Sequence, residues 1–152
     1  MEKNVVSHQF GEVRNKASYL FFKRLFDISI SLVGMIVLVI VTIILAIFYS
    51  FGKNKGKIFF SQERIGLNGK RFKIYKYRSM VENAQEILKR DPKLYQKYIE
   101  NSYKLLPEED PRMTRLGRFI RKHSIDEIPQ FINILKGDMS FIGPRPILEK
   151  EL

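Results

Sequence analysis

Two adjacent carboxylates, Asp126 and Glu127, are the residues of this chain best suited to chemistry. With Ser124 they have the spacing of a capping box, in which Ser124 accepts from the helix start and Glu127 reaches back. A plain helix cap is therefore one interpretation of the pair. The second interpretation is catalytic, because the N–H groups at a helix N-terminus bind phosphate and keep a nearby carboxylate ionised.

An ionised Asp126 can attack phosphorus and form an acyl phosphate, which divides one group transfer into two steps. Both carboxylates, together with diphosphate oxygens, would suit Mg²⁺, which prefers hard oxygen ligands. Arg121, five residues upstream, and Arg145 are candidates to neutralise charge on the transferring group. Adjacent helix positions point about 100° apart, so we expect different roles for the two carboxylates.

Arg145 lies between two prolines in the segment Phe141-Ile142-Gly143-Pro144-Arg145-Pro146. The prolines stiffen the backbone, so the guanidinium is held at low entropic cost. A polar turn that ends the domain is the alternative. The chain has no Cys and only two His, which excludes thiol chemistry and a multi-histidine metal centre.

The elements that must position these residues can be predicted from local patterns. Apolar residues at 58–60 and 72–74 flank Leu67-Asn68-Gly69-Lys70, which is typical of a β-hairpin with an Asn-Gly turn. Helices are predicted over 81–90, 93–103, 114–122 and 124–136, with Gly137 ending the last. The helix over 114–122 is basic and amphipathic, and suits either an anionic membrane surface or an ordinary protein surface.

A 21-residue apolar run, residues 28–48, carries no charge and is long enough for a membrane helix. A signal peptide would be shorter and end in small residues, and a domain this small could scarcely surround a buried core helix. Basic residues flank the run at Lys16, Lys23, Arg24, Lys53, Lys55, Lys57 and Arg64. Because Lys and Arg favour the cytoplasmic side, both ends are expected there, which favours a re-entrant helix over a straight span.

The formal net charge of +11 predicts a polyanionic partner, namely anionic lipid, nucleic acid or a phosphorylated substrate. No aromatic and basic platform accompanies the charge, so nucleic acid is not expected.

Six stretches must be considered together: residues 23–27, 62–66, 72–80, 114–122, 124–130 and 136–146. In order and spacing they resemble the bacterial sugar transferases, the monotopic phosphoglycosyl transferases that initiate polysaccharide or glycoprotein-glycan assembly. The resemblance implies transfer of a sugar phosphate from a UDP-sugar to polyprenyl phosphate, with release of UMP. This would be the first membrane step of exopolysaccharide, capsule or glycoconjugate assembly.

By the same resemblance, Asp126 would be the nucleophile and Glu127 its partner, aiding Mg²⁺ or proton handling. Arg121 would contact phosphate, and Arg145 would bind the phosphate or the uridine of the donor. Lys76 and Arg78, on the second arm of the hairpin, are further candidates for phosphate binding, and a solvated strand edge protected by cations is the alternative. The implied partners are the UDP-sugar, polyprenyl phosphate, anionic membrane lipid and other polysaccharide-assembly proteins. The implied place is the inner or plasma membrane, with the catalytic part facing the cytoplasm.

Two features depart from the family pattern. A Ser-Pro pair usually turns the family's membrane helix back, whereas Val39-Ile40 occupies that position here, so the helix can run on unbroken. The chain ends at Leu152, soon after the Gly-Pro-Arg-Pro element, where the family continues. A catalytically impaired, membrane-associated scaffold protein of the same family is therefore the alternative function.

The expected fold is mainly α with a small β-hairpin. A polar N-terminal extension over 1–20 precedes a membrane helix over 21–50, either re-entrant or spanning. A compact interfacial domain over 51–152, truncated at its C-terminus, would carry the catalytic residues and face the cytoplasm.

Overall fold

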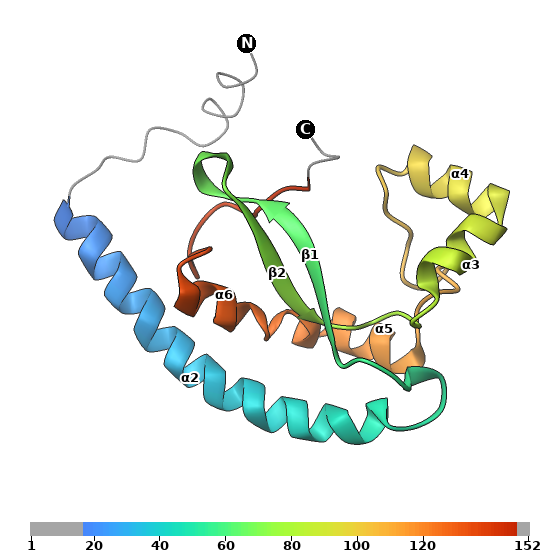
Figure 1. The fold of residues 1–152 in the computed structure, drawn as a ribbon, viewed down its shortest axis with the longest axis horizontal. Helices are drawn as coiled ribbons and strands as arrows, with labels where there is room; N and C mark the ends of the chain where they lie inside the picture. The colour runs from blue at the N-terminus through green and yellow to red at the C-terminus, as the bar shows by residue number, and fades with distance from the viewer. Residues whose placement is uncertain (1–16, 149–152) are drawn as a thin grey trace, which may run out of the picture. The chain divides into compact units, whose positions relative to one another are not determined.

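The computed structural model describes residues 17–148, which form five α-helices, three short 3₁₀ helices and one β-hairpin (Figure 1). The predicted class, mainly α with a small hairpin, is confirmed. Residues 1–16 of the predicted polar extension lie outside the described residues.

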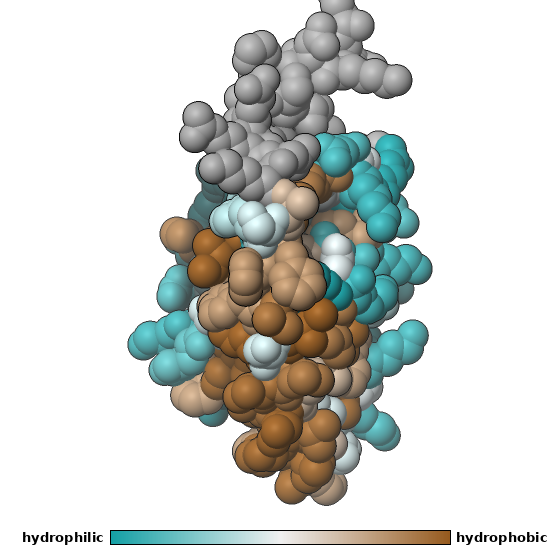
Figure 2. All heavy atoms as spheres, turned by 90° about the vertical axis from the view of Figure 1, so that its left-hand side faces the viewer, coloured by the Kyte–Doolittle hydropathy of each residue, from teal (hydrophilic) through white to brown (hydrophobic). Residues whose placement is uncertain are grey.

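Helix α2 runs without a break from Ala17 to Tyr49, so it begins ahead of residue 21, where the sequence analysis placed its start. Its 33 residues make it about 50 Å long. Among residues 17–148 it is the one helix long and apolar enough to cross a membrane. Most of its apolar side chains are exposed, and Figure 2 shows hydrophobic residues gathered along it. This exposure argues against the core-helix alternative, because a core helix is covered on all sides.

The hairpin pairs β1 (Phe59–Ile65) with β2 (Arg71–Tyr77), and both strands are longer than predicted. A 3₁₀ turn at Leu67–Gly69 joins them. Asn68 and Gly69 adopt positive φ angles of 57° and 73°, a region that Asn and Gly enter at low cost. The predicted Asn-Gly turn is therefore confirmed.

The described residues divide into two compact units, and α2, β1 and β2 each contribute to both. The first unit contains residues 17–38, 61–75 and 129–148. In it, helix α6 (Gln130–Lys136) lies between α2 and the hairpin (Figure 1). Gly34 permits the approach of α2, because a Cβ there would lie 2.3 Å from the ring of Phe131.

The second unit contains residues 39–60 and 76–128, with helices α3 (Ala84–Arg90), α4 (Pro92–Glu100) and α5 (Arg115–Lys122). All three were predicted, and α3 and α4 are shorter than expected. The starts of α4 and α5 follow from capping: Asp91 accepts from two N–H groups of α4, and Thr114 accepts from the N–H of Gly117 in α5. The side chain of Ile120 is completely buried and anchors α5.

The continuous helix predicted over 124–136 is wrong. A 3₁₀ turn at Ile125–Glu127 comes first, and α6 begins only at Gln130. Pro129 lacks an N–H and interrupts the hydrogen bonding that a longer helix would need. Ser124 has φ of 56° and its side chain makes no cap bond, so its half of the predicted capping box is absent. Gly137 ends α6 with a φ of 85°, as predicted.

Candidate active site

Asp126 and Glu127 lie side by side on the 3₁₀ turn that follows α5, yet they occupy different environments. Asp126 is buried, with 5% of its surface exposed, whereas half of the Glu127 side chain is exposed. The left-handed Ser124 makes this turn, because it stops α5 and redirects the chain. The difference in exposure supports distinct roles for the two carboxylates.

Lys76, close to the end of β2, brings an ammonium group to both carboxylates. Its Nζ lies 2.8 Å from Oε1 of Glu127 and 4.0 Å from Oδ2 of Asp126. The Lys76 side chain is only 20% exposed, so the pairing is partly desolvated and stronger than one on the surface. The structure thus brings together three of the residues that the sequence analysis selected.

The electrostatics of Asp126 are governed first by its burial, which raises the pKa of its carboxyl above the ordinary value. The Lys76 ammonium opposes this rise, the neighbouring Glu127 carboxylate adds to it, and the Arg121 guanidinium lowers the pKa again. Lys76 and Arg121 thus favour the ionised form of Asp126, whereas its burial favours the neutral form. The ionised form of such a partly desolvated carboxylate is a competent nucleophile.

Arg121, in the last turn of α5, is the fourth member of this cluster. It is exposed, and its Nη1 lies 3.7 Å from the sulfur of Met113. Because its charge reaches Asp126, it can meet an anion bound at the dyad.

Arg78 is placed differently from the prediction. Its guanidinium is buried and donates to the backbone carbonyls of Asn54, Lys55, Lys57 and Met80. These four carbonyls accept from most of its N–H donors, so Arg78 joins the segment after α2 to the end of β2. Binding of phosphate by Arg78 stays a prediction.

Arg145 belongs to the first unit, where it is exposed on the segment after α6. It lines a pocket of about 380 Å³ together with residues of the first turns of α2, the hairpin loop and the segment 137–146. Lys23 and Arg24 add positive charge to this pocket, and Leu67, Phe72 and Met139 add apolar surface.

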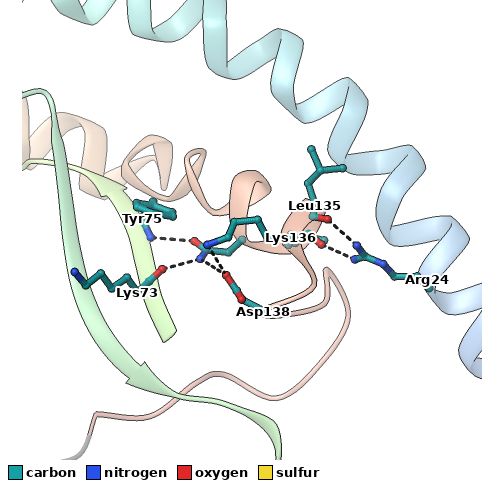
Figure 3. Close-up of polar contacts among 8 residues, drawn as sticks. Arg24, Lys73, Tyr75, Leu135, Lys136 and Asp138 are labelled. Carbon is teal, nitrogen blue, oxygen red and sulfur yellow. Dashed lines mark hydrogen bonds and ion pairs between the residues drawn. The ribbon is translucent and has the colours of Figure 1, made fainter. Parts of the chain in front are cut away.

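Two residues at the start of α2, Arg24 and Asp27, support the segment that leads to Arg145. Arg24 donates to the carbonyls of Ile134 and Leu135 at the end of α6, at 2.7 and 2.6 Å (Figure 3). The buried carboxylate of Asp27 accepts from the Ser140 hydroxyl and the Phe141 N–H, each at 3.0 Å. From the sequence, Asp27 contributed only to the family resemblance, and Arg24 to that resemblance and to the basic flank of the apolar run. The sequence signal for their structural role was the position of Arg24 and Asp27 directly before the apolar run.

Asn133 was also missed. Its side chain is completely buried and joins α6 to β2: it accepts from the N–H of Tyr75 at 3.0 Å and donates to the carbonyl of Lys73 at 2.7 Å. A further bond runs to the carboxylate of Asp138, which Figure 3 shows beside these two strand residues. An Asn within the apolar stretch of α6 was the signal for such a network.

A magnesium site on the dyad agrees with the donor types present. Within residues 17–148 no group of three or more His, Cys, Asp or Glu side chains could hold a metal by itself. Mg²⁺ is commonly held by one or two carboxylates plus substrate phosphates, and Asp126 and Glu127 supply that number. Their oxygen ligands fit Mg²⁺, with the remaining ligands left to a diphosphate and water.

Comparison with known proteins places this geometry in a family context. The family described as bacterial sugar transferase matches residues 18–152. The undecaprenyl-phosphate galactose phosphotransferase of Salmonella typhimurium is 45% identical over 141 residues, which are 90% of this chain and 29% of that protein. The galactosyl transferase CpsE of Streptococcus agalactiae is 46% identical over 131 residues, 86% of this chain and 28% of CpsE. A Bacillus subtilis protein named for N-acetylgalactosaminyl 1-phosphate transfer to undecaprenyl phosphate is 40% identical, and the match spans 69% of it.

Proposed function

The chain belongs to the bacterial sugar transferase family, and we propose that it transfers a sugar phosphate from a UDP-sugar to polyprenyl phosphate through a covalent phospho-aspartyl intermediate. The products are polyprenyl-diphosphate sugar and UMP. The chain spans less than a third of the two relatives named for galactose transfer. The name of the Salmonella relative makes undecaprenyl phosphate the acceptor to examine first, and that of an Erwinia amylovora relative, UDP-galactose-lipid carrier transferase, makes UDP-galactose the first donor.

Asp126 is the nucleophile in this proposal. An oxygen of its carboxylate attacks the phosphorus that carries the sugar, the bond from that phosphorus to the UMP oxygen breaks, and UMP leaves with the electron pair. An oxygen of polyprenyl phosphate then attacks the same phosphorus, and the bond to Asp126 breaks. The carboxylate is thereby regenerated, and each step replaces one phosphorus–oxygen bond by another.

The residues around Asp126 suit the charge that this reaction develops. Lys76 and Arg121 lie near enough to lower the pKa of its carboxyl, and both can stabilise negative charge on a transferring phosphoryl group. Glu127 is half exposed and is placed to hold a cation or accept a proton from water. Mg²⁺ bound here would neutralise diphosphate charge and orient the donor.

Arg145 is proposed to bind the phosphate or the uridine of the donor. Its segment is fixed to α2 through Ser140 and Phe141, whose donors are both taken by Asp27. This anchoring reduces the conformational entropy that binding must remove.

Each end of α2 is joined by hydrogen bonds to polar elements of its own unit. Near its start, Arg24 bonds the carbonyls that end α6. Near its end, Thr42 shares a hydrogen bond of 2.7 Å with Tyr77, and the Tyr49 hydroxyl donates to the carbonyl of Arg78. We propose that both ends lie at the cytoplasmic face, because basic residues flank the apolar run on both sides. The exposed apolar face of α2 would then enter one leaflet, with the catalytic part facing the cytoplasm.

The observation that carries the proposed function is the buried carboxylate of Asp126 with Lys76 beside it. The test uses the chain in lipid nanodiscs with Mg²⁺, undecaprenyl phosphate and UDP-galactose, followed by other UDP-sugars. We expect UMP release, a phosphosugar adduct on Asp126 by mass spectrometry when the acceptor is omitted, and loss of both in Asp126→Asn.

A folded chain that releases no UMP with any donor would refute the proposal. So would an Asp126→Asn variant that keeps the wild-type rate.

A further inference from the structure

Lys76 makes a contact with the dyad that phosphate binding alone does not explain. Its ammonium lies 2.8 Å from the Glu127 carboxylate and 4.0 Å from the Asp126 carboxylate. Side chains alternate along a strand, so Lys76 shares the face of β2 that carries the buried Phe72 and Ile74. The opposite face carries both the exposed Lys73 and the buried Tyr77. The Lys76 side chain itself is 20% exposed, so it is a partly buried charge, and such a charge needs a partner.

The ammonium lies beside both carboxylates, so a divalent cation held by Asp126 and Glu127 would meet a like charge there. Mg²⁺ requires oxygen ligands at about 2.0–2.1 Å, so it must approach these carboxylates more closely than Nζ does. Two positive charges cannot occupy this space together without strong repulsion. Binding of Mg²⁺ to these carboxylates is therefore disfavoured while Lys76 keeps its present position.

We propose that Lys76 is a tethered cation that holds the metal position of the dyad in the ligand-free protein and yields it when a divalent cation arrives with a diphosphate. Its flexible four-carbon stem allows the ammonium to leave Glu127, whose side chain is half exposed and open to an incoming ion. The released ammonium then pairs with a phosphate oxygen. This inference rests on the proposed function, because it assigns Lys76 a second position in the same site.

The consequence is that Lys76 suppresses binding of a divalent cation to the protein without donor. A neighbouring positive charge within 4–6 Å changes proton binding to a carboxylate by about 10- to 1,000-fold. A cation of charge two should respond at least as strongly. Removing the ammonium should tighten divalent cation binding by about tenfold or more.

The test measures Mn²⁺ affinity by electron paramagnetic resonance on the purified chain in nanodiscs, without nucleotide. Lys76→Met should bind Mn²⁺ at least about tenfold more tightly than wild type, whereas Lys76→Arg, which keeps the charge, should show no tightening. Lys93→Met is the matched control: it removes the same charge at an exposed position of α4 and should leave the affinity unchanged. Adding Glu127→Gln to Lys76→Met should abolish the gain.

Unchanged or weaker Mn²⁺ binding by a folded Lys76→Met protein would overturn the proposal, as would equal tightening in Lys93→Met. Thermal unfolding of each variant establishes that it is folded. The outcome is separable from that of the transferase assay. Release of UMP with no tightening in Lys76→Met refutes the tethered cation alone, whereas tightening without UMP release refutes the transferase alone.

Discussion

The backbone N–H of Phe141 donates to the carboxylate of Asp27 at 3.0 Å, across 114 positions of the sequence. The same carboxylate oxygen accepts from the hydroxyl of Ser140, and only 4% of Asp27 is exposed. The first turns of α2 therefore hold the segment that carries Arg145 in the first unit.

Replacing Asp27 tests this anchoring. Asp27→Ala leaves the Ser140 and Phe141 donors without their acceptor and should lower the free energy of unfolding by about 1–3 kcal/mol. Asp27→Asn keeps an oxygen at the same position and should lower it by less than about 1 kcal/mol. Chemical denaturation in nanodiscs compares them, and equal losses in the two variants would contradict the anchoring role.

Asn133→Asp probes the buried junction between α6 and β2. The substitution removes the amide donor to the Lys73 carbonyl and places a carboxylate beside Asp138. We expect a loss of about 3 kcal/mol or more at neutral pH, because a buried charge is left without a partner. The new carboxyl would have a raised pKa in the fold, so part of the loss should disappear when the pH is lowered enough to protonate it. A loss that does not depend on pH would argue against this explanation.

Gly117 is the point of closest approach between α5 and the chain after β2. A Cβ at this position would lie 1.8 Å from the backbone oxygen of Ser79, which cannot be relieved by moving a side chain. Gly117→Ala should therefore destabilise the second unit by about 2 kcal/mol or more. Gly143→Ala is the control, since its Cβ would meet its nearest neighbour at an ordinary 3.7 Å. Similar melting temperatures for the two variants would show that α5 does not pack in this way.

The raised pKa of Asp126 predicts a pH-dependent difference between wild type and Asp126→Asn. Below the ordinary Asp pKa of about 3.8 the carboxyl is protonated in both states, and its ionisation has no effect on stability. As the pH rises through the raised pKa, the folded wild type loses stability, because ionisation is easier in the unfolded chain. Asp126→Asn has no such loss, so its melting temperature relative to wild type should increase with pH and then level off. A difference that stays constant or falls with pH would contradict the burial effect.

The position of α2 can be tested with single cysteines, because the chain contains none. Ser7→Cys and Glu108→Cys place thiols ahead of α2 and in the exposed loop before α5. If both ends of α2 lie at the cytoplasmic face, a membrane-impermeant thiol reagent should label both in inverted vesicles and neither in intact cells with a permeable outer layer. Labelling of one site from each side would reject the same-side arrangement in favour of a span.

Local sequence patterns were enough to predict the elements that depend only on neighbouring residues. The apolar run gives α2, Asn68-Gly69 gives the hairpin turn, and Gly137 ends α6, because periodicity and backbone preference act within a few residues. The failed prediction over 124–136 also has a local cause. Pro129 and the left-handed Ser124 outweighed a capping pattern that suited a continuous helix.

The sequence by itself determined the candidate nucleophile, the family resemblance and the apolar helix. Only the tertiary structure decided which basic residues contact the Asp126–Glu127 dyad. It brought Lys76 to Glu127 across 51 positions and directed the Arg78 guanidinium to backbone carbonyls. Both are basic residues of one short stretch, and sequence patterns cannot separate them. The physical difference is the partner: an ammonium beside carboxylates can respond to a ligand, whereas a guanidinium saturated by carbonyls belongs to the fold.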